Sequence, residues 1–254
     1  MTEKVIGIMG AMPEEIGTIT ALLTDIQTFE FGKRTYYTGT INGIKTVLVF
    51  SRWGKVAAAT TVTTLIHEFN ITELIFTGVA GAISPTLKIG DIVIAGRLIQ
   101  HDMDARPLMQ QFEIPLLGIT YFDCNKTEVE VAEKIVTELT THKHLEALID
   151  KAELVKFGIV DPQVLVGDVA SGDKFFSDNI HKEGLLAELP SILCVEMEGA
   201  SVAQVCYEYS IPYTIIRTIS DTADDKAAND FPSFIKNISS KYSQEIIKLY
   251  FNQF

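Results

Sequence analysis

The chain has 254 residues, of which 47% are hydrophobic, and it carries a formal net charge of −12 at pH 7. This length and apolar content are enough to bury a substantial core, as one large α/β domain or two small ones. The negative charge repels phosphate backbones and anionic lipid headgroups. Neither nucleic acid nor a membrane surface is therefore an expected partner.

The cysteine content and the N-terminal sequence both bear on the cellular compartment. Three cysteines (Cys124, Cys194 and Cys206) form an odd set without a CxxC motif, which is typical of a reducing compartment and predicts no disulfide framework. The N-terminus lacks the basic and long apolar regions of a signal peptide. No apolar run approaches the roughly 20 residues that a membrane span needs. These features predict a cytoplasmic protein.

Short apolar runs rich in β-branched residues predict seven strands. In chain order they cover residues 4–9, 45–50, 73–80, 91–96, 164–172, 192–196 and 213–220. Several of these runs are apolar without alternation, which indicates strands covered on both faces.

Helical patterns separate many of these strands. Helices are expected at residues 13–26, 54–69, 126–156 and 198–209, and in a C-terminal segment whose apolar stripe is formed by Phe234, Ile238, Tyr242, Ile246 and Tyr250. Alternating strands and helices favour a parallel sheet with helices on both faces. We therefore expect one α/β domain over residues 1–254, a three-layer sandwich whose central sheet is mixed, mostly parallel and twisted.

The common cofactor and nucleophile motifs are absent. No GxGxxG follows a strand, and GK[ST], GxSxG and HExxH do not occur. His101, Asp102 and Asp104 could ligate a metal, but no second histidine lies nearby, so a hydrogen-bonded loop is the favoured interpretation. We therefore expect neither a metal nor a cofactor.

Acidic residues and glycines gather where the predicted strands end, which is where parallel α/β sheets bind ligands. The positions are Glu14 and Glu15, Gly78 and Gly81, Glu196 and Glu198, and Arg217, Ser220 and Asp221. Each has a simpler explanation as a helix cap, a tight turn, or an acid pair held by the arginine. Three separate strand-end acids beside a glycine-rich strand exit nevertheless favour a site.

Five separated motifs carry a resemblance to a known family. In order they read "GIMGAMPEE", "FTGVAGA", "VGDVASGDKFF", "VEMEGASVAQVC" and "IRTISDTAD". From residue 5 to the C-terminal helix, the chain resembles the bacterial methylthioadenosine/S-adenosylhomocysteine nucleosidases of the nucleoside phosphorylase superfamily. "VEMEGA" with "ISDTAD" is specific to that superfamily, and "GAMPEE" indicates its hydrolases.

The resemblance implies hydrolysis of the N-glycosidic bond of 5′-methylthioadenosine or S-adenosylhomocysteine, with 5′-deoxyadenosine and aminodeoxyfutalosine as further candidate substrates. The ribose gains oxocarbenium character as adenine departs, so such an enzyme protonates the base, supplies a water molecule and holds the ribose. By the resemblance, Asp221, held by Ser220, protonates the five-membered ring of adenine. Glu15 activates the water, Glu198 binds the ribose hydroxyls, and Arg217 orients nearby carboxylates.

The resemblance also implies a set of substrate-binding residues. Phe175 stacks on the purine, Phe176 offers backbone hydrogen bonds to the adenine edge, and Met197 packs on the ribose. Glu196 supports the water site or the nearby arginine. The rest of the binding site is formed by Met12, Trp53, Val79, Ala80, Gly81 and Phe231.

Two alternatives to a hydrolase remain open. A phosphorylase of the same fold needs cations around its phosphate, yet no arginine precedes "TGVAG" and acids follow the first strand. Arg52 lies where the nucleosidases usually have a small residue and keeps this alternative open. A non-catalytic nucleoside-binding protein is the other alternative. The combination of Glu15, Glu198 and Asp221 argues against it, because binding alone needs no water-activating acid.

Several positions depart from the family pattern and concern the 5′-substituent. Trp53 replaces a smaller aliphatic residue, and Val79 replaces a serine. The family is typically homodimeric, so residues 102–118 are expected to complete the neighbouring subunit's site. Within this loop, Arg106 is a candidate to meet an anionic 5′-group.

Overall fold

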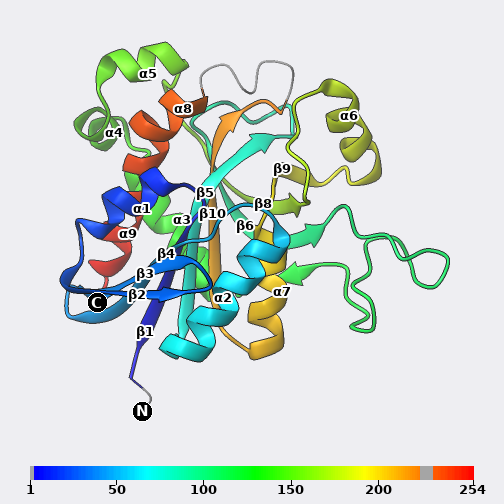
Figure 1. The fold of residues 1–254 in the computed structure, drawn as a ribbon. Helices are drawn as coiled ribbons and strands as arrows, with labels where there is room; N and C mark the ends of the chain where they lie inside the picture. Colours follow the sequence, from blue (N-terminus) through cyan, green and yellow to red (C-terminus); the bar gives the residue numbers. More distant parts are fainter. Residues whose placement is uncertain (1–2, 224–230) are drawn as a thin grey trace.

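The computed structural model describes residues 3–223 and 231–254, and strands alternate with helices along most of this sequence (Figure 1). The strands are β1 (Val5–Gly10), β2 (Thr24–Phe31), β3 (Arg34–Ile41), β4 (Ile44–Phe50), β5 (Glu73–Ala82), β6 (Ile92–Gln100), β7 (Phe122–Asp123), β8 (Val164–Ser171), β9 (Ile192–Glu196) and β10 (Tyr213–Asp221). All seven predicted strands are present.

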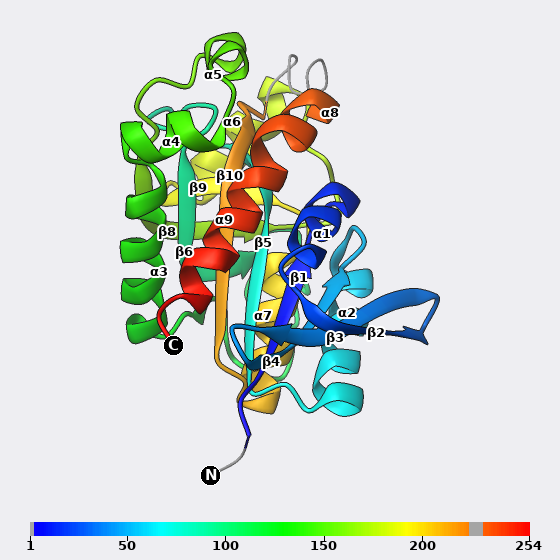
Figure 2. The ribbon, with the colours of Figure 1, turned by 90° about the vertical axis from the view of Figure 1, so that its left-hand side faces the viewer.

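Helices lie on both sides of the central strands. They are α1 (Pro13–Thr20), α2 (Lys55–Phe69), α3 (Lys126–Leu139), α4 (His142–Leu148), α5 (Lys151–Phe157), α6 (Asn179–Glu188), α7 (Gly199–Tyr209), α8 (Phe231–Phe234) and α9 (Ser240–Phe251), with a π-helical segment, Ile235–Ser239, between the last two. Helices α1, α3 and α9 cover one side of the central strands, and α2 packs beside α7 on the other (Figure 2).

The sheet is mixed, and parallel pairings run through its centre. Strands β4, β1, β5 and β10 pair in parallel, as do β6, β8 and β9. Antiparallel pairing of β10 with β6 and of β5 with β9 closes a ring of five strands, β5-β10-β6-β8-β9. Strands β3 and β2 extend the sheet beyond β4. The predicted α/β fold, a mixed sheet flanked by helices, is confirmed.

Both faces of the central strands are buried, as their unbroken apolar sequence predicts. In β1, Ile6 and Ile8 pack in the cluster that includes Phe251 of α9, whereas Met9 packs in the cluster that includes Leu65 of α2. Alternate side chains of a strand point to opposite faces, so a strand between two helical layers must be apolar at successive positions.

Two predicted helices differ from the structure, and four of the described elements were not predicted. The helix expected over 13–26 ends at Thr20 because residues 24–31 form β2, an exposed edge strand without an apolar signal. The helix expected over 126–156 is divided into α3, α4 and α5. Asp150, whose side chain accepts a hydrogen bond from the Ala152 N–H at 2.8 Å, starts the third of these. Strands β2, β3 and β7 and helix α6 were not predicted. None of the described helices is long and apolar enough to cross a bilayer.

Candidate active site

A cavity of about 320 Å³ lies at the carboxyl ends of six strands. Its walls come from the segments that follow β1, β4 and β8 and from the ends of β5, β9 and β10. Its lining residues are Ala11, Met12, Trp53, Val79, Ala80, Gly81, Lys174, Phe175, Phe176, Val195, Glu196, Met197, Glu198, Ser220, Asp221 and Phe231. This is where an α/β sheet places its ligands.

The cavity gathers most of the residues singled out in the sequence. All ten expected binding residues line it, together with Glu198, Ser220 and Asp221. Glu15 and Arg217 do not line it, because both side chains are fully buried behind its wall. Glu14 is exposed on the first turn of α1 and takes no part in the cavity.

Asp221 is positioned by an irregularity at the end of β10. The pairing of β10 with β5 shifts register between Ile219 and Asp221, and such a bulge redirects side chains at the rim of a sheet. The Asp221 carboxylate accepts hydrogen bonds from the Ser220 hydroxyl at 2.7 Å and from the Ala223 N–H at 2.8 Å. A Cβ on Gly81 would lie 2.9 Å from an Asp221 carboxylate oxygen, so glycine is needed there.

Glu198 ends the turn between β9 and α7 and points toward the start of α2. One carboxylate oxygen accepts the Gly54 N–H at 2.8 Å. Gly54 has a φ of +88°, a region that favours glycine. Burial raises the pKa of the Glu198 carboxyl, and the negative charge of Glu196 raises it further. A proton is therefore held at this position to a higher pH than on an exposed glutamate.

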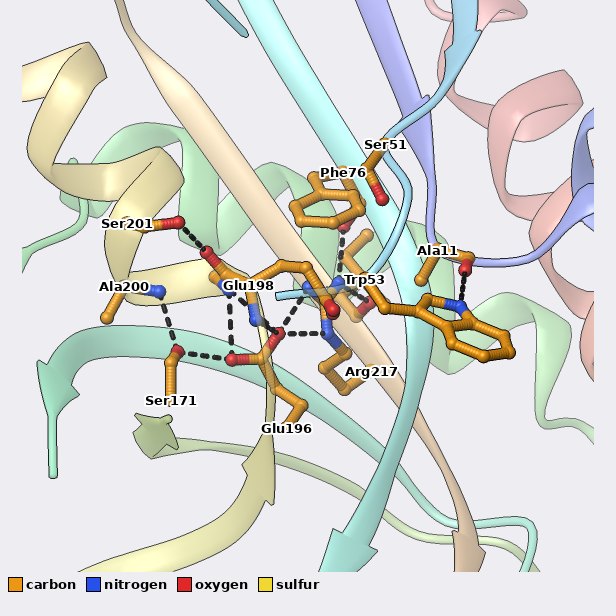
Figure 3. A network of polar contacts seen from close by, with 12 residues as sticks. Ala11, Ser51, Trp53, Phe76, Ser171, Glu196, Glu198, Ala200, Ser201 and Arg217 are labelled. Carbon is orange, nitrogen blue, oxygen red and sulfur yellow. Dashed lines mark hydrogen bonds and ion pairs between the residues drawn. The ribbon is translucent and has the colours of Figure 1, made fainter. Parts of the chain in front are cut away.

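Glu196 and Arg217 form a buried ion pair beneath Glu198 (Figure 3). The guanidinium donates to one Glu196 oxygen at 2.8 and 3.2 Å, and to the Phe76 and Ile216 carbonyls at 3.1 Å each. Glu196 also accepts the Ser171 hydroxyl and the Gly199 N–H. The Arg217 guanidinium thus contacts Glu196 of the two acids, and the bond from the Gly199 N–H to Glu196 holds the turn that carries Glu198.

Glu15 caps helix α1, as its position allows, and is also held by a distant helix. One carboxylate oxygen accepts the backbone N–H groups of Ala11 and Met12 at 3.1 and 3.0 Å. The other accepts the Ser239 hydroxyl at 2.6 Å and the Ser243 hydroxyl at 3.1 Å. Burial raises the pKa of the Glu15 carboxyl, while these hydroxyls and the charge of Arg217 oppose that rise. Glu15 thus lies directly behind the cavity wall formed by Ala11 and Met12.

Aromatic side chains form the rim of the cavity. The rings of Phe175 and Phe231 lie edge to face with centroids 6.4 Å apart, and Phe175 remains half exposed. Trp53 is 62% exposed and anchors its ring by donating the indole N–H to the Ala11 carbonyl at 3.1 Å. Phe176 is instead buried, against the His101 ring. A flat apolar ligand can therefore enter between partly exposed aromatic faces.

The comparisons with known proteins agree with this arrangement. A family model described as the phosphorylase superfamily matches residues 5–251. The 5′-methylthioadenosine/S-adenosylhomocysteine nucleosidase of Marinomonas sp. is 33% identical over 96% of this chain and 99% of its own length. The chain belongs to this nucleosidase family within the phosphorylase superfamily. The resemblance inferred from the five motifs is confirmed.

Solved structures extend the similarity to enzymes named for other substrates. An S-adenosylhomocysteine nucleosidase from Streptococcus pyogenes, in complex with 5-methylthiotubericidin, superposes with a TM-score of 0.82 at 32% identity and covers 100% of this chain and 98% of its own. A futalosine hydrolase of Helicobacter pylori gives a TM-score of 0.84 at 31% identity, with 99% of this chain and 98% of its own covered. Family membership therefore leaves the 5′-substituent open.

The two arginines that depart from the family pattern lie outside the cavity. The side chain of Arg52 donates to the Lys33 carbonyl and lines a separate cavity. Arg106 pairs with Asp104 at 2.5 Å within the loop over 102–118. This loop extends away from the body of the molecule (Figure 1), and none of its residues lines the cavity of its own chain.

The candidate metal ligands His101, Asp102 and Asp104 have other contacts. Asp102 accepts the Lys55 ammonium at 2.5 Å and the Asp173 N–H at 2.9 Å. Asp104 pairs with the arginine of its own loop, and the His101 ring packs against Phe176. Across residues 3–223 and 231–254, no group of three or more metal-ligating side chains comes together.

Four residues that position the acids were not singled out in the sequence. Gly54 donates to Glu198, and Ser171 donates to Glu196. Ser239 and Ser243 both donate to Glu15. The sequence did carry a signal for Ser239 and Ser243. These serines lie four residues apart beside the apolar stripe of the C-terminal helix, and a buried hydroxyl there needs a hydrogen-bond partner. The π-helical segment that ends at Ser239 marks the same place.

Proposed function

We propose that this nucleosidase hydrolyses the N-glycosidic bond of adenosine-type nucleosides with a 5′-thio substituent, of which 5′-methylthioadenosine and S-adenosylhomocysteine are the first candidates. The proposal rests on one observation: Glu198 and Asp221 face a single cavity, and Glu15 lies directly behind its wall. Adenine and a free thioribose are the products.

In the proposed mechanism, Asp221 protonates the five-membered ring of adenine as the bond to the anomeric carbon breaks. Asp221 enters this step protonated and leaves it as a carboxylate, which the Ser220 hydroxyl and the Ala223 N–H stabilise by donating hydrogen bonds to it. The bonding electrons leave with the base, and water adds to the anomeric carbon and gives a proton to Glu15, a transfer that requires the wall formed by Ala11 and Met12 to open and admit the water. The raised pKa of the buried Glu15 brings it closer to the range that suits a general base.

Glu198 has the role of holding the ribose. One of its oxygens is occupied by the Gly54 N–H, which fixes the carboxylate beside the cavity. Positive charge on the ribosyl group favours the ionised form of this carboxyl, so its negative charge and its hydrogen bonds from the 2′- and 3′-hydroxyls would strengthen in the transition state. Met197 packs on the sugar, Phe175 stacks on the purine and Phe176 offers its backbone to the adenine edge. Arg217 is a positioning residue, because it contacts Glu196 and not the cavity.

Phosphorolysis is the weaker alternative. Lys174 is the one cation among the described residues that line the cavity, and its ammonium contacts the His181 ring. Arg52, which kept this alternative open, faces another cavity. The test is release of adenine from methylthioadenosine in phosphate-free buffer. Release at full rate, with free thioribose as product, supports the hydrolase. A strict requirement for phosphate would reject it, and tight binding without turnover would indicate a binding protein.

We further propose a homodimer in which the loop over 102–118 completes the neighbouring cavity. Leu108 and Leu116 of this loop are 88% and 90% exposed, which suits contact with a second copy. Three free cysteines also suit a reducing cytoplasm, where the reaction would serve methionine salvage. Light scattering gives the mass in solution. A monomer that retains full activity would reject the role given to the loop.

A further inference from the structure

A second cavity of about 350 Å³ adjoins the candidate active site. It lies between α1 and the start of β3, and its polar lining includes Tyr37 and the cationic residues Lys33, Arg34 and Arg52. This concentration of positive charge stands out in a chain whose net charge is −12.

The three cations have no carboxylate partner among the described residues. The Arg34 guanidinium donates to the carbonyls of Gly32 and Ala57 at 2.9 and 3.2 Å, and Arg52 donates to the Lys33 carbonyl. Carbonyl oxygens orient the two guanidinium groups without neutralising them. Glu30, which accepts a hydrogen bond from Thr35 at the rim, makes no ion pair with any of the three within the described ranges. The charge facing the cavity is therefore uncompensated.

Two further observations show that this arrangement is unfavourable without a ligand. The Nε of Arg34 is buried and has no hydrogen-bond partner within residues 3–223 and 231–254. Burial lowers the pKa of Arg34, and the charge of Arg52 lowers it further. An anion between these groups would relieve both the repulsion and the missing hydrogen bond.

The second cavity shares its boundary with the first. Met12 lines the first cavity and Pro13 the second, while Trp53 lines the first and Arg52 the second. The two cavities thus meet at consecutive residues of the same two segments. The cations are therefore the nearest charged groups beyond Met12 and Trp53 along these two segments.

We propose that the cavity lined by Lys33, Arg34 and Arg52 is an anion-binding site that takes a carboxylate or phosphate group. The anion comes either from the 5′-substituent of the nucleoside in the first cavity or from a free anion such as inorganic phosphate. The first source rests on the proposed function, and the second does not.

The experiment titrates inorganic phosphate into the full chain by calorimetry at constant ionic strength. The variant is Arg52→Gly. Arg52 has a φ of +60°, a region that favours glycine, so the substitution removes the side chain without straining the backbone. The control is Lys126→Ala, which removes one charge from an exposed ion pair on α3. We expect saturable binding that weakens by about tenfold or more in Arg52→Gly, as the loss of a charge-assisted contact implies, and that is unchanged in the control.

A kinetic arm identifies the source of the anion. It measures the ratio of kcat/KM for a nucleoside with a 5′-carboxyalkylthio group to that for its neutral methyl ester. If Arg52→Gly lowers this ratio by about tenfold or more, the occupant is the substituent. Phosphate binding that depends on Arg52, with an unchanged ratio, assigns the site to a free anion. The calorimetric measurement of phosphate binding does not depend on activity, so it tests the anion site even if the chain does not hydrolyse nucleosides. Absence of saturable phosphate binding together with an unchanged ratio overturns the proposal, as does equal weakening in Lys126→Ala.

Discussion

Replacing Arg217 with methionine deprives a buried carboxylate of its charge partner. Glu196 and Arg217 have side-chain exposures of 2% and 0%, so water cannot replace the lost guanidinium. Methionine retains an apolar stem near the Phe76 ring, over which the guanidinium lies at 4.1 Å, and so limits the change to charge and hydrogen bonding. The substitution therefore isolates the electrostatic contribution of the pair.

The expected loss of stability follows from these contacts. Removing one partner of a buried ion pair typically costs about 3–5 kcal/mol. Glu196 retains hydrogen bonds from the Ser171 hydroxyl and from the N–H groups of Glu198 and Gly199, which places Arg217→Met toward the lower end of that range. Glu196→Gln leaves the guanidinium unpaired instead and should cost a similar amount. The double variant should lose about 2–3 kcal/mol less than the sum, since the two residues share one interaction.

The measurement is urea unfolding of the four proteins at pH 7, followed by far-UV circular dichroism. Coupling of this size would establish that the pair is desolvated and acts as a unit. Single variants that each lose less than about 1 kcal/mol, as at a surface ion pair, would refute the reasoning. Losses that add without coupling would refute it as well.

Three further predictions concern the acids of the site. Asp221→Asn should lower kcat by about 10²–10⁴-fold while an adenine-containing inhibitor still binds, because the amide has no proton suited to the leaving base; unchanged kcat would remove the assignment. Ser239→Ala removes a hydrogen bond to the Glu15 carboxylate, so it should raise the pKa of Glu15 further and move the acidic limb of the pH–rate profile to higher pH. The control Ser240→Ala should leave that limb in place, because the Ser240 hydroxyl donates to the Lys236 carbonyl. Burial, with the neighbouring negative charge, raises the folded-state pKa of Glu198 above 4.5, so its contribution to stability is complete below the pKa of the unfolded chain and is lost as pH rises through the folded value. Glu198→Gln should therefore lose less stability than the wild type between pH 4 and pH 8 in chemical unfolding, and parallel curves would contradict the raised pKa.

Much of the fold could be predicted because it depends on local patterns. Strands buried on both faces have unbroken apolar sequences, and each of these was found. Strand β2 escaped because seven of its eight residues are exposed and its sequence, "TDIQTFEF", carries little apolar signal. The same lack of an apolar strand signal explains why the helix predicted over 13–26 is longer than α1, which ends at Thr20. Residues 24–26 could continue a helical pattern, and only pairing with β3 makes them a strand.

The sequence by itself determined that acids end the strands β9 and β10 and follow β1, because the order of motifs along the chain fixes which strand carries which group. For Glu196 it left two roles, support of the water site or of Arg217, and the ion pair with the arginine is seen only in the structure. Only the tertiary structure decided which of these groups face the cavity. Glu15 is held by Ser239 and Ser243, more than 220 residues away along the chain, and Arg52 turns into a second cavity. The direction and environment of a side chain depend on strand register and on the packing of distant helices, neither of which is encoded locally.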